Sequence, residues 1–515
     1  MQISSFDESS RFRFLSRSGS TILFILASSL ATTEARADGT QASQSTDGQP
    51  ADPTRAAVAP APTGPTPEVA PDAKSTAPLP PAGPVVEAIP PVVKEPSLPD
   101  LDKKIAAKAP RGFTAISIMP ASYTITGANP AREKLADWGF SYYGYSINTA
   151  QQNLLNASRS ARNGDQQYFG QKASAYSLSN LMLAYSFDSI GLPDTQIQGG
   201  IGFATTTWEP AGPKLFSTTG LALYQSLFDR AVELKVGLLS NSYEFVGTYV
   251  GDNLASAIFG ASSTIPAETG MSDARAPKPG ANITLHWGNY YSKFGAAVSS
   301  SPEGYVAEKR DNVSGFKWKT ANSNGLIVEE VGFRRAASAK DPKTWVRVGY
   351  IRNWSDYTDY AHGGRSSQNY SFYALGDHQV LRFNNGNASG LNIGGSAFLG
   401  LDRYAPIAQS YEARFYVTGP FHSRPGDVIS FIATDNVFSQ YVVNAVRKAG
   451  GFAKEGSWVL TWAYSAAIAP GTYAGLGLAY ADHPTVGAYT PDDPVAGTVG
   501  TRHALMPIGN VSMFF

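Results

Sequence analysis

The sequence predicts an all-β protein whose strands close into a transmembrane antiparallel β-barrel. Three observations favour this fold over a soluble β-sandwich, in which apolar and polar residues would alternate in the same way. The apolar face of several predicted strands ends in Trp or Tyr, as is typical of a membrane–water interface. The opposite face carries Gly, Ser, Thr and charged residues, which a large barrel places around water. An export signal accompanies an aromatic last strand that ends at Phe515.

Residues 1–37 are predicted to be a signal peptide. Three basic residues, Arg11, Arg13 and Arg17, precede the apolar stretch TILFILASSLA, and the tripeptide ARA supplies the small residues that a signal peptidase needs. We expect cleavage before Asp38 and export from the cytoplasm.

Residues 38–112 form a Pro- and Ala-rich segment with very few aromatic residues. Such a composition buries too little apolar surface to offset the entropy of ordering, so we expect a disordered segment in the periplasm. At roughly 3.1 Å per residue in a polyproline II conformation, it could extend over more than about 100 Å. It is either a spacer that contacts the cell wall or a solvated tail.

The predicted barrel domain, residues 113–515, begins with one short helix near residues 130–138, in the stretch NPAREKLADWGF. Pro130 suits the first helical turn, Leu135 and Trp138 share one face, and Gly139 stops the helix. No other long helix is expected.

The remainder of the domain alternates between apolar and polar residues with a period of two. In AVELKVGLL, Val232, Leu234 and Val236 oppose Glu233 and Lys235, and the stretches NITLHWG, YEARFYV, WVLTWAY and LGLAY alternate in the same way. The stretches GDVISFIA and GLIVEEVGF do not define which face is inward. The chain ends on IGNVSMFF, whose outer residues are apolar.

The number of strands follows from the length of the domain. Every backbone group in lipid must be paired, so the sheet must close on itself. About 375 to 400 residues, at roughly ten per spanning strand plus turns and loops, give about 16 strands. A barrel of that size leaves an aqueous lumen.

Composition excludes several other classes of protein. The 41 basic and 41 acidic side chains balance, which argues against nucleic acid as a partner. Cysteine is absent, and the six His residues lack metal-ligand spacing. The sequence has neither a G-x-S-x-G elbow nor a phosphate-binding Gly loop. We therefore expect no enzyme activity, no cofactor and no metal.

Strand alternation nominates a set of charged residues that point into the lumen. Opposite charges facing each other across water would create a transverse field that aligns dipolar solutes without strongly selecting one sign of ion. The alternative is that each residue is a salt-bridged wall residue that only maintains the barrel. The candidates for lining the pore are Glu233, Lys235, Lys293, Glu330, Arg334, Arg347, Glu412 and Arg414.

Residues 259–282 form the best candidate for a constriction loop. The segment FGASSTIPAETGMSDARAPKPGAN is long, rich in small residues and flanked by predicted strands. It is either the constriction of the pore or an ordinary surface loop.

Seven phrases, in this order along the chain, resemble the carbohydrate-selective porins of the OprB family: REKLADWGFSYYGY, LKVGLLSNSYEF, SAIFGASSTIP, VEEVGFR, RVGYIRN, YSFYALGDHQVLR and YVTGPFHSRPGDVISF. The resemblance implies a sixteen-stranded outer-membrane barrel, a short helix before the first strand, an in-folded loop that constricts the pore, and passive uptake of sugars. Positions within these phrases add further pore-lining candidates, namely Glu244, Asp377, Gln379, Arg424 and Asp427.

The predicted function is that of a porin in the outer membrane of a Gram-negative bacterium, which lets sugars diffuse selectively into the periplasm. One alternative is a general or weakly anion-preferring porin, because the candidates from strand alternation include five basic and three acidic residues. Another is a barrel-anchored envelope tether. The expected partners are mono- or oligosaccharides, outer-membrane lipid, the outer-membrane assembly machinery acting on the strand that ends at Phe515, the cell wall, and two further copies in a homotrimer.

Overall fold

The computed structural model describes residues 100–113, 118–155, 166, 168–208, 215–247, 260–273, 276–384, 386, 388–448, 453–484 and 503–515. The predicted signal peptide and residues 38–99 of the Pro- and Ala-rich segment lie outside these ranges. Among the residues described, no helix is both long enough and apolar enough to cross a membrane.

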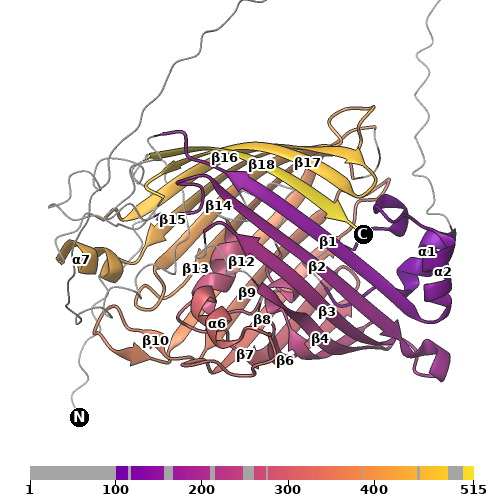
Figure 1. Ribbon diagram of the computed structural model, residues 1–515, viewed down its shortest axis with the longest axis horizontal. Coiled ribbons are helices and arrows are strands. Elements are labelled where there is room, and N and C mark those ends of the chain that lie inside the picture. The colour runs from indigo at the N-terminus through magenta and orange to yellow at the C-terminus, as the bar shows by residue number, and fades with distance from the viewer. Residues whose placement is uncertain are drawn as a thin grey trace, which may run out of the picture. The chain divides into compact units, whose positions relative to one another are not determined.

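Sixteen strands within the described ranges form one closed antiparallel barrel, which confirms the predicted fold class (Figure 1). A separate hairpin consists of β10 (Tyr357–Thr358) and β11 (Arg365–Ser366). The barrel strands are β1 (Phe140–Gln151), β2 (Ser174–Ser186), β3 (Thr195–Thr206), β4 (Leu215–Leu227), β5 (Val232–Leu239), β6 (Lys278–Trp287), β7 (Tyr290–Val298), β8 (Gly325–Arg335), β9 (Thr344–Asn353), β12 (Asn369–Arg382), β13 (Gly390–Leu399), β14 (Ile407–Thr418), β15 (Val428–Phe438), β16 (Gly456–Ala469), β17 (Thr472–Asp482) and β18 (His503–Phe514).

The barrel closes where the first strand pairs with the last. β1 and β18 run antiparallel from the pair Tyr145–Phe514 to the pair Gln151–Ile508. This pairing leaves the sheet without an edge, as a structure in lipid requires.

Side chains alternate between the two faces of the wall as the period-two pattern predicts. On β5, Leu234 and Val236 are 38% and 52% exposed on the outer face, whereas Lys235 between them is 5% exposed and points inward. On β8, where the sequence left the face open, Glu330 is buried on the inner side and its neighbour Glu329 lies on the outer side.

The two ends of the barrel differ in the length of their connections. At one end the turns are short: β6 and β7 are joined through two residues, and the turn between β16 and β17 uses Gly471 at φ +70°. The N-terminal helices and the C-terminus lie at this same end (Figure 1). The long connections, including residues 240–277, leave from the other end.

The described helices are short. The predicted helix is confirmed as α2, in which the side chain of Asn129 caps the first turn by accepting from the backbone N–H groups of Ala131 and Arg132. None of the helices described exceeds nine residues. They are α1 (Asp100–Lys108), η1 (Ala121–Tyr123), α2 (Pro130–Asp137), η3 (Phe187–Ile190), α3 (Asn241–Glu244), α5 (Ala261–Thr269), α6 (Tyr305–Asp311) and α7 (Gln440–Lys448).

Helix α1 corrects the predicted extent of disorder. The segment was expected to be disordered as far as residue 112, but its last part, DLDKKIAAK, is helical. Acidic residues in the first turn and a Lys in the last turn suit the helix dipole. Ile105 packs against Ala121 and Ala136, so this part of the segment buries an apolar face that the Pro-rich composition upstream lacks.

Candidate pore constriction

In the connection between β5 and β6, the described residues 240–247 and 260–273 fold into the lumen. It corrects the predicted loop boundaries of residues 259–282, because Lys278 through Asn282 belong to β6 and pair with β5. The connection contains α3 and α5, and α5 contacts the inner side of β9, β12, β13 and β14. Loop residues pack against wall residues in one apolar cluster, formed by Phe245, Val246, Ala261, Ile265, Met271, Leu326, Val328, Ile351, Tyr373, Leu375 and Phe398.

Helix α5 carries a buried carboxyl group, that of Glu268. Its side-chain oxygens have no hydrogen-bond partner among the residues described. Burial raises the pKa of Glu268 to about 8, so the group is largely neutral at pH 7. The phenol rings of Tyr357 and Tyr360 lie close enough for this carboxyl to raise their own pKa values further.

Helix α3 forms a bridge across the barrel. The hydroxyl of Tyr243 lies 2.7 Å from the hydroxyl of Tyr145 on β1. Glu244 accepts from Lys235 of β5 at 2.7 Å, and the backbone oxygen of Glu244 accepts from Lys293 of β7 at 2.8 Å. Strands β1, β5 and β7 therefore hold one short helix, with β5 and β7 separated only by β6.

Arg347 on β9 holds the end of this bridge. Its Nη2 donates to the backbone oxygen of Gly247 at 2.9 Å and also to that of Val246. Its guanidinium carbon lies 3.5 Å from the ring centre of Trp345. β1 and β9 are opposite one another in the ring of sixteen strands, so the side-chain contacts of residues 243–247 reach both sides of the lumen.

The carboxylate of Glu330 faces Arg347, with Oε2 3.8 Å from Nε. It accepts from the hydroxyls of Tyr291 and Tyr373, each at 2.7 Å. The rings of these tyrosines lie flat over glycines: a Cβ on Gly349 would be 2.2 Å from the ring of Tyr373. Glycine is required here for close approach.

Arg414 on β14 forms a second ionic group. Its Nη1 lies 2.5 Å from Glu412, and its Nη2 lies 3.0 Å from Asp377. The backbone oxygens of Gly376 and Gly395 accept from the same guanidinium at 3.1 Å. All four contacting groups come from three adjacent strands, β12, β13 and β14.

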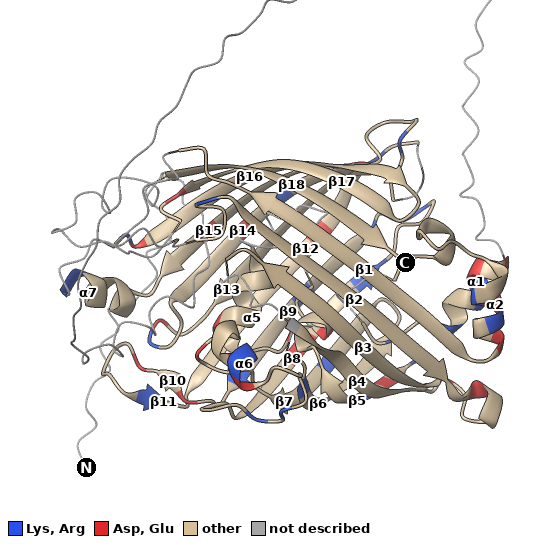
Figure 2. Ribbon diagram, viewed as in Figure 1, with Lys and Arg blue, Asp and Glu red and all other residues tan. Residues whose placement is uncertain are grey.

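Inward-facing charges in the wall and bridge compensate one another. Charged residues otherwise gather mainly at the helices and loops at the two ends (Figure 2). Four cations meet four carboxylates in these groups, namely Lys235, Lys293, Arg347 and Arg414 with Glu244, Glu330, Glu412 and Asp377. All eight are candidates that the sequence nominated.

The remaining candidates lie apart from these groups. Glu233 contacts Tyr224 at 2.7 Å and His286 at 3.2 Å near the short-turn end of β5. Arg334 is exposed, with its guanidinium carbon 4.8 Å from the ring centre of Trp345.

Three candidates stabilise connections at the short-turn end. Gln379 accepts from the backbone N–H of Lys343 at 3.2 Å and donates to Ser389 O at 3.0 Å. Arg424 and Asp427 pair at 2.6 Å within the turn between β14 and β15.

Four of the candidates are too buried to meet water directly, and whether the others line the path of the solute stays a prediction. The side chains of Glu330, Arg347, Glu412 and Arg414 have no exposed surface. The reason is that partner side chains, and for Glu330 and Arg347 the in-folded loop, cover them. Their side chains face inward, but the groups that cover them lie between these side chains and the open lumen.

Sequence reasoning missed the tyrosines that fix the bridge. Tyr145 lies in the phrase FSYYGY, where polar and aromatic residues mix, and Tyr243 lies in a loop without periodicity. The alternation of β1 offered one signal, because Ser141, Tyr143 and Tyr145 share the inward face with Thr149.

No group of three or more His, Asp or Glu side chains within the described ranges is arranged to hold a metal ion.

Comparisons with known proteins agree with this geometry. A family profile described as carbohydrate-selective porin, OprB family, matches residues 137–501. The high-pH structure of Pseudomonas putida OprB is 14% identical, covers 78% of this chain and 100% of its own, and has a TM-score of 0.63. The low-pH structure of the same protein is 11% identical with a TM-score of 0.45 and the same coverage. A triple mutant of Rhodopseudomonas blastica porin is 9% identical, covers 73% of this chain and 100% of its own, and has a TM-score of 0.37. No curated protein matches the sequence.

Proposed function

The chain belongs to the OprB family of carbohydrate-selective porins, which admit sugars by passive diffusion through the outer membrane of Gram-negative bacteria, and from this premise we propose that its sugars are selected where the β5–β6 connection crosses the lumen. The bridge from Tyr145 to Arg347 carries the proposal, because it divides a lumen that sixteen strands alone would leave wide and open.

A sugar that enters such a passage exchanges water for polar groups on the wall. Its hydroxyls need donors and acceptors, and the passage must release it again, so binding has to stay weak. The inward face of β15 to β18 supplies neutral groups of this kind, on the side of the ring away from β5. They include Ser430, Thr434, Thr461, Ser465, Asn510 and Ser512, which are each at most 9% exposed and would present only part of their polar surface to a sugar.

The compensated charges favour a neutral solute over an ion. Lys235, Lys293, Arg347 and Arg414 each have a carboxylate within 4 Å, and together with Glu244, Glu330, Glu412 and Asp377 their formal charges sum to zero. An anion-preferring pore needs uncompensated cations along its path. The basic excess in the sequence-derived candidates therefore gives little support to the anion-preferring alternative.

Planar-bilayer conductance tests the proposal. We expect that added glucose or an oligosaccharide reduces the ion current through the purified full chain in a concentration-dependent way. A reversal potential close to zero in a salt gradient should accompany this block. A channel that no sugar blocks, and that conducts anions selectively, would contradict the carbohydrate assignment and support the general porin.

The orientation of the barrel follows from its turns. Short turns of outer-membrane barrels face the periplasm, so we place α1, and with it the C-terminal end of the Pro- and Ala-rich segment, on the periplasmic side. Recognition of the last strand by the assembly machinery, association into a homotrimer and contact with the cell wall remain predictions. Light scattering of the detergent-solubilised protein and cross-linking to purified cell wall would test the last two.

A further inference from the structure

Residues 108–113, which continue from the last residue of α1, run inside the barrel, although all of them except Phe113 lie in the segment expected to be disordered. We call residues 108–113 the strap. Gln196 and Gln198, on the inward face of β3, donate to the backbone oxygens of Ala109 and Arg111 at 3.1 Å and 3.0 Å. Strand β3 thus binds the strap through its backbone.

The two ends of the strap are fixed differently. At its start, Lys108 lies 2.5 Å from Asp188. Further along, Arg111 lies 2.5 Å from Asp194 in the turn before β3. At its end, the ring of Phe113 packs against the cluster of Tyr143, Tyr145 and Met182 on the inner face of β1 and β2. The strap therefore lies along the inner wall from the short-turn rim into the lumen.

Gly112 allows the strap to lie close to the wall. Its φ of +78° is in the left-handed region, and a Cβ would be 3.0 Å from the ring of Tyr224 and 3.4 Å from Lys235.

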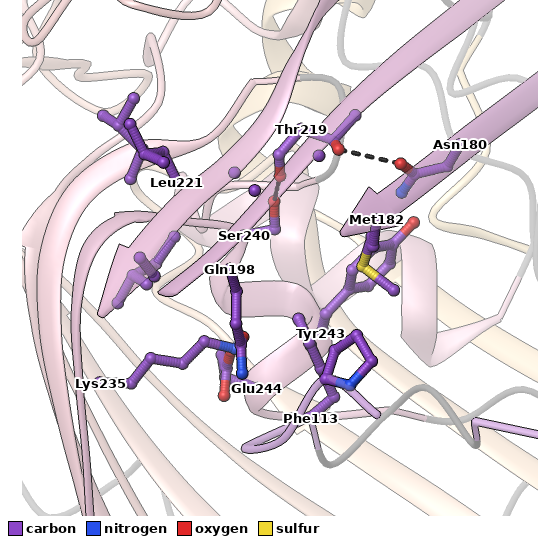
Figure 3. Close-up of a pocket in the computed structure, with 17 residues that line it drawn as sticks. Phe113, Asn180, Met182, Gln198, Thr219, Leu221, Lys235, Ser240, Tyr243 and Glu244 are labelled. Atoms are coloured by element: carbon purple, nitrogen blue, oxygen red, sulfur yellow. Dashed lines mark hydrogen bonds and ion pairs between the residues drawn. The ribbon is translucent and has the colours of Figure 1, made fainter. Parts of the chain in front are cut away.

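One lysine joins the strap to the constriction. Lys235 Nζ lies 3.4 Å from the ring centre of Phe113, 2.7 Å from Glu244 Oε1 and 3.5 Å from the backbone oxygen of Arg111. Figure 3 shows Lys235 and Gln198 converging on Glu244 with Phe113 beside them. With its side chain 6% exposed, Lys235 is shielded from solute by the strap and by α3.

We propose that the strap is a specificity-determining part of the channel: it fills the lumen on the side of β1 to β5 and covers the charge of Lys235. The proposal rests on the proposed function and adds that the N-terminal segment, not only the β5–β6 connection, sets the width and charge of the passage. Solute is then confined to the opposite side, lined by β15 to β18.

The test is the substitution Phe113→Ala in the full chain, measured by single-channel conductance and reversal potential in a salt gradient without sugar. We expect a larger conductance and a shift of the reversal potential toward anions, because Lys235 becomes accessible and shares the single carboxylate of Glu244 with Lys293, so that this group has a net positive charge. The matched control is Phe228→Ala, which removes the same ring at a site 78% exposed in the turn between β4 and β5. It should leave both quantities at their wild-type values.

The double variant Phe113→Ala with Lys235→Met distinguishes the effect of a wider passage from the effect of the Lys235 charge. Its conductance should stay high, while its reversal potential should return toward that of the wild type. An anion shift that persists without the lysine would overturn the role given to Lys235. Wild-type conductance and reversal potential in Phe113→Ala, with a closed barrel confirmed by heat-modifiable mobility on gels, would overturn the proposal itself.

If Phe113→Ala does not fold, Gln198→Ala decides the matter, because it removes one donor to the strap and leaves the strap sequence intact. A smaller change in the same direction supports the proposal, and unchanged conductance overturns it. Both readouts are taken without sugar, so they are independent of whether sugar blocks the channel.

Discussion

Arg347 and Gly247 stand 100 residues apart in the chain, and a hydrogen bond of 2.9 Å joins them. Through this contact the barrel wall at β9 holds the end of the bridge that begins at Tyr145 on β1. Because the guanidinium also faces Glu330, one buried side chain serves both the loop and the wall.

Arg347→Met should lower the free energy of unfolding by about 3 to 5 kcal/mol, because it leaves the buried carboxylate of Glu330 without its cation. Denaturant titration in detergent measures this change. Arg352→Met is the matched control on the same strand, since Arg352 faces outward. A loss of equal size in both variants would contradict the special role of Arg347.

Arg414→Met should cost a similar amount, about 3 to 5 kcal/mol, since it leaves Glu412 and Asp377 facing each other within the wall. Adding Glu412→Gln and Asp377→Asn to that variant should recover much of the loss, because the repulsion disappears. Thermal unfolding of the single and triple variants is the measurement. A triple variant no more stable than the single one would show that packing, not charge, is lost.

Glu268 makes the loop sensitive to pH. Its pKa is about 8 in the folded chain and 4.5 as the ordinary value, so the folded state binds the extra proton between these two values. The free energy of unfolding should therefore fall as pH rises from 4.5 toward 8, and level off above.

Glu268→Gln should remove this dependence, because the amide cannot ionise. Hydrogen exchange of residues 260–273 across that pH range is the measurement. Protection that decreases with pH equally in the wild type and the variant would assign the effect to another group.

Phe515→Ala should reduce the fraction of chain that reaches the outer membrane as a closed barrel. Backbone bonds between Phe515 and Gly144, at 2.8 Å and 3.3 Å, remain in the variant, but the ring that packs over Gly144 is lost. Met513→Ala, at the next outward position of β18, is the control. Heat-modifiable mobility of membrane fractions compares the two, and equal yields would contradict recognition of the terminal ring.

The alternation of residues was sufficient to predict the barrel and the inward direction of Lys235, Arg347 and Arg414. A period of two specifies which face a side chain is on, because successive residues of a strand point to opposite faces. It does not specify which residue from a distant loop covers that side chain. The contacts of Arg347 with Val246 and Gly247 depend on the path of a connection that has no periodicity.

The strap and α1 could not be predicted for a different reason. The composition of residues 38–112 is dominated by Pro and Ala, and the short apolar face around Ile105 is lost in that average. The sequence around Phe113 has no periodicity that would predict its position, because its contacts come from three different strands, β1, β2 and β5.

The bridge across the lumen is bound to the wall at both of its ends by groups buried on opposite sides of the ring. Because both ends are held, residues 243–247 should move little relative to the barrel wall. Single-channel recordings should therefore show a steady open-state current with few brief closures. Substitutions that release either end of the bridge should increase the fluctuations of that current.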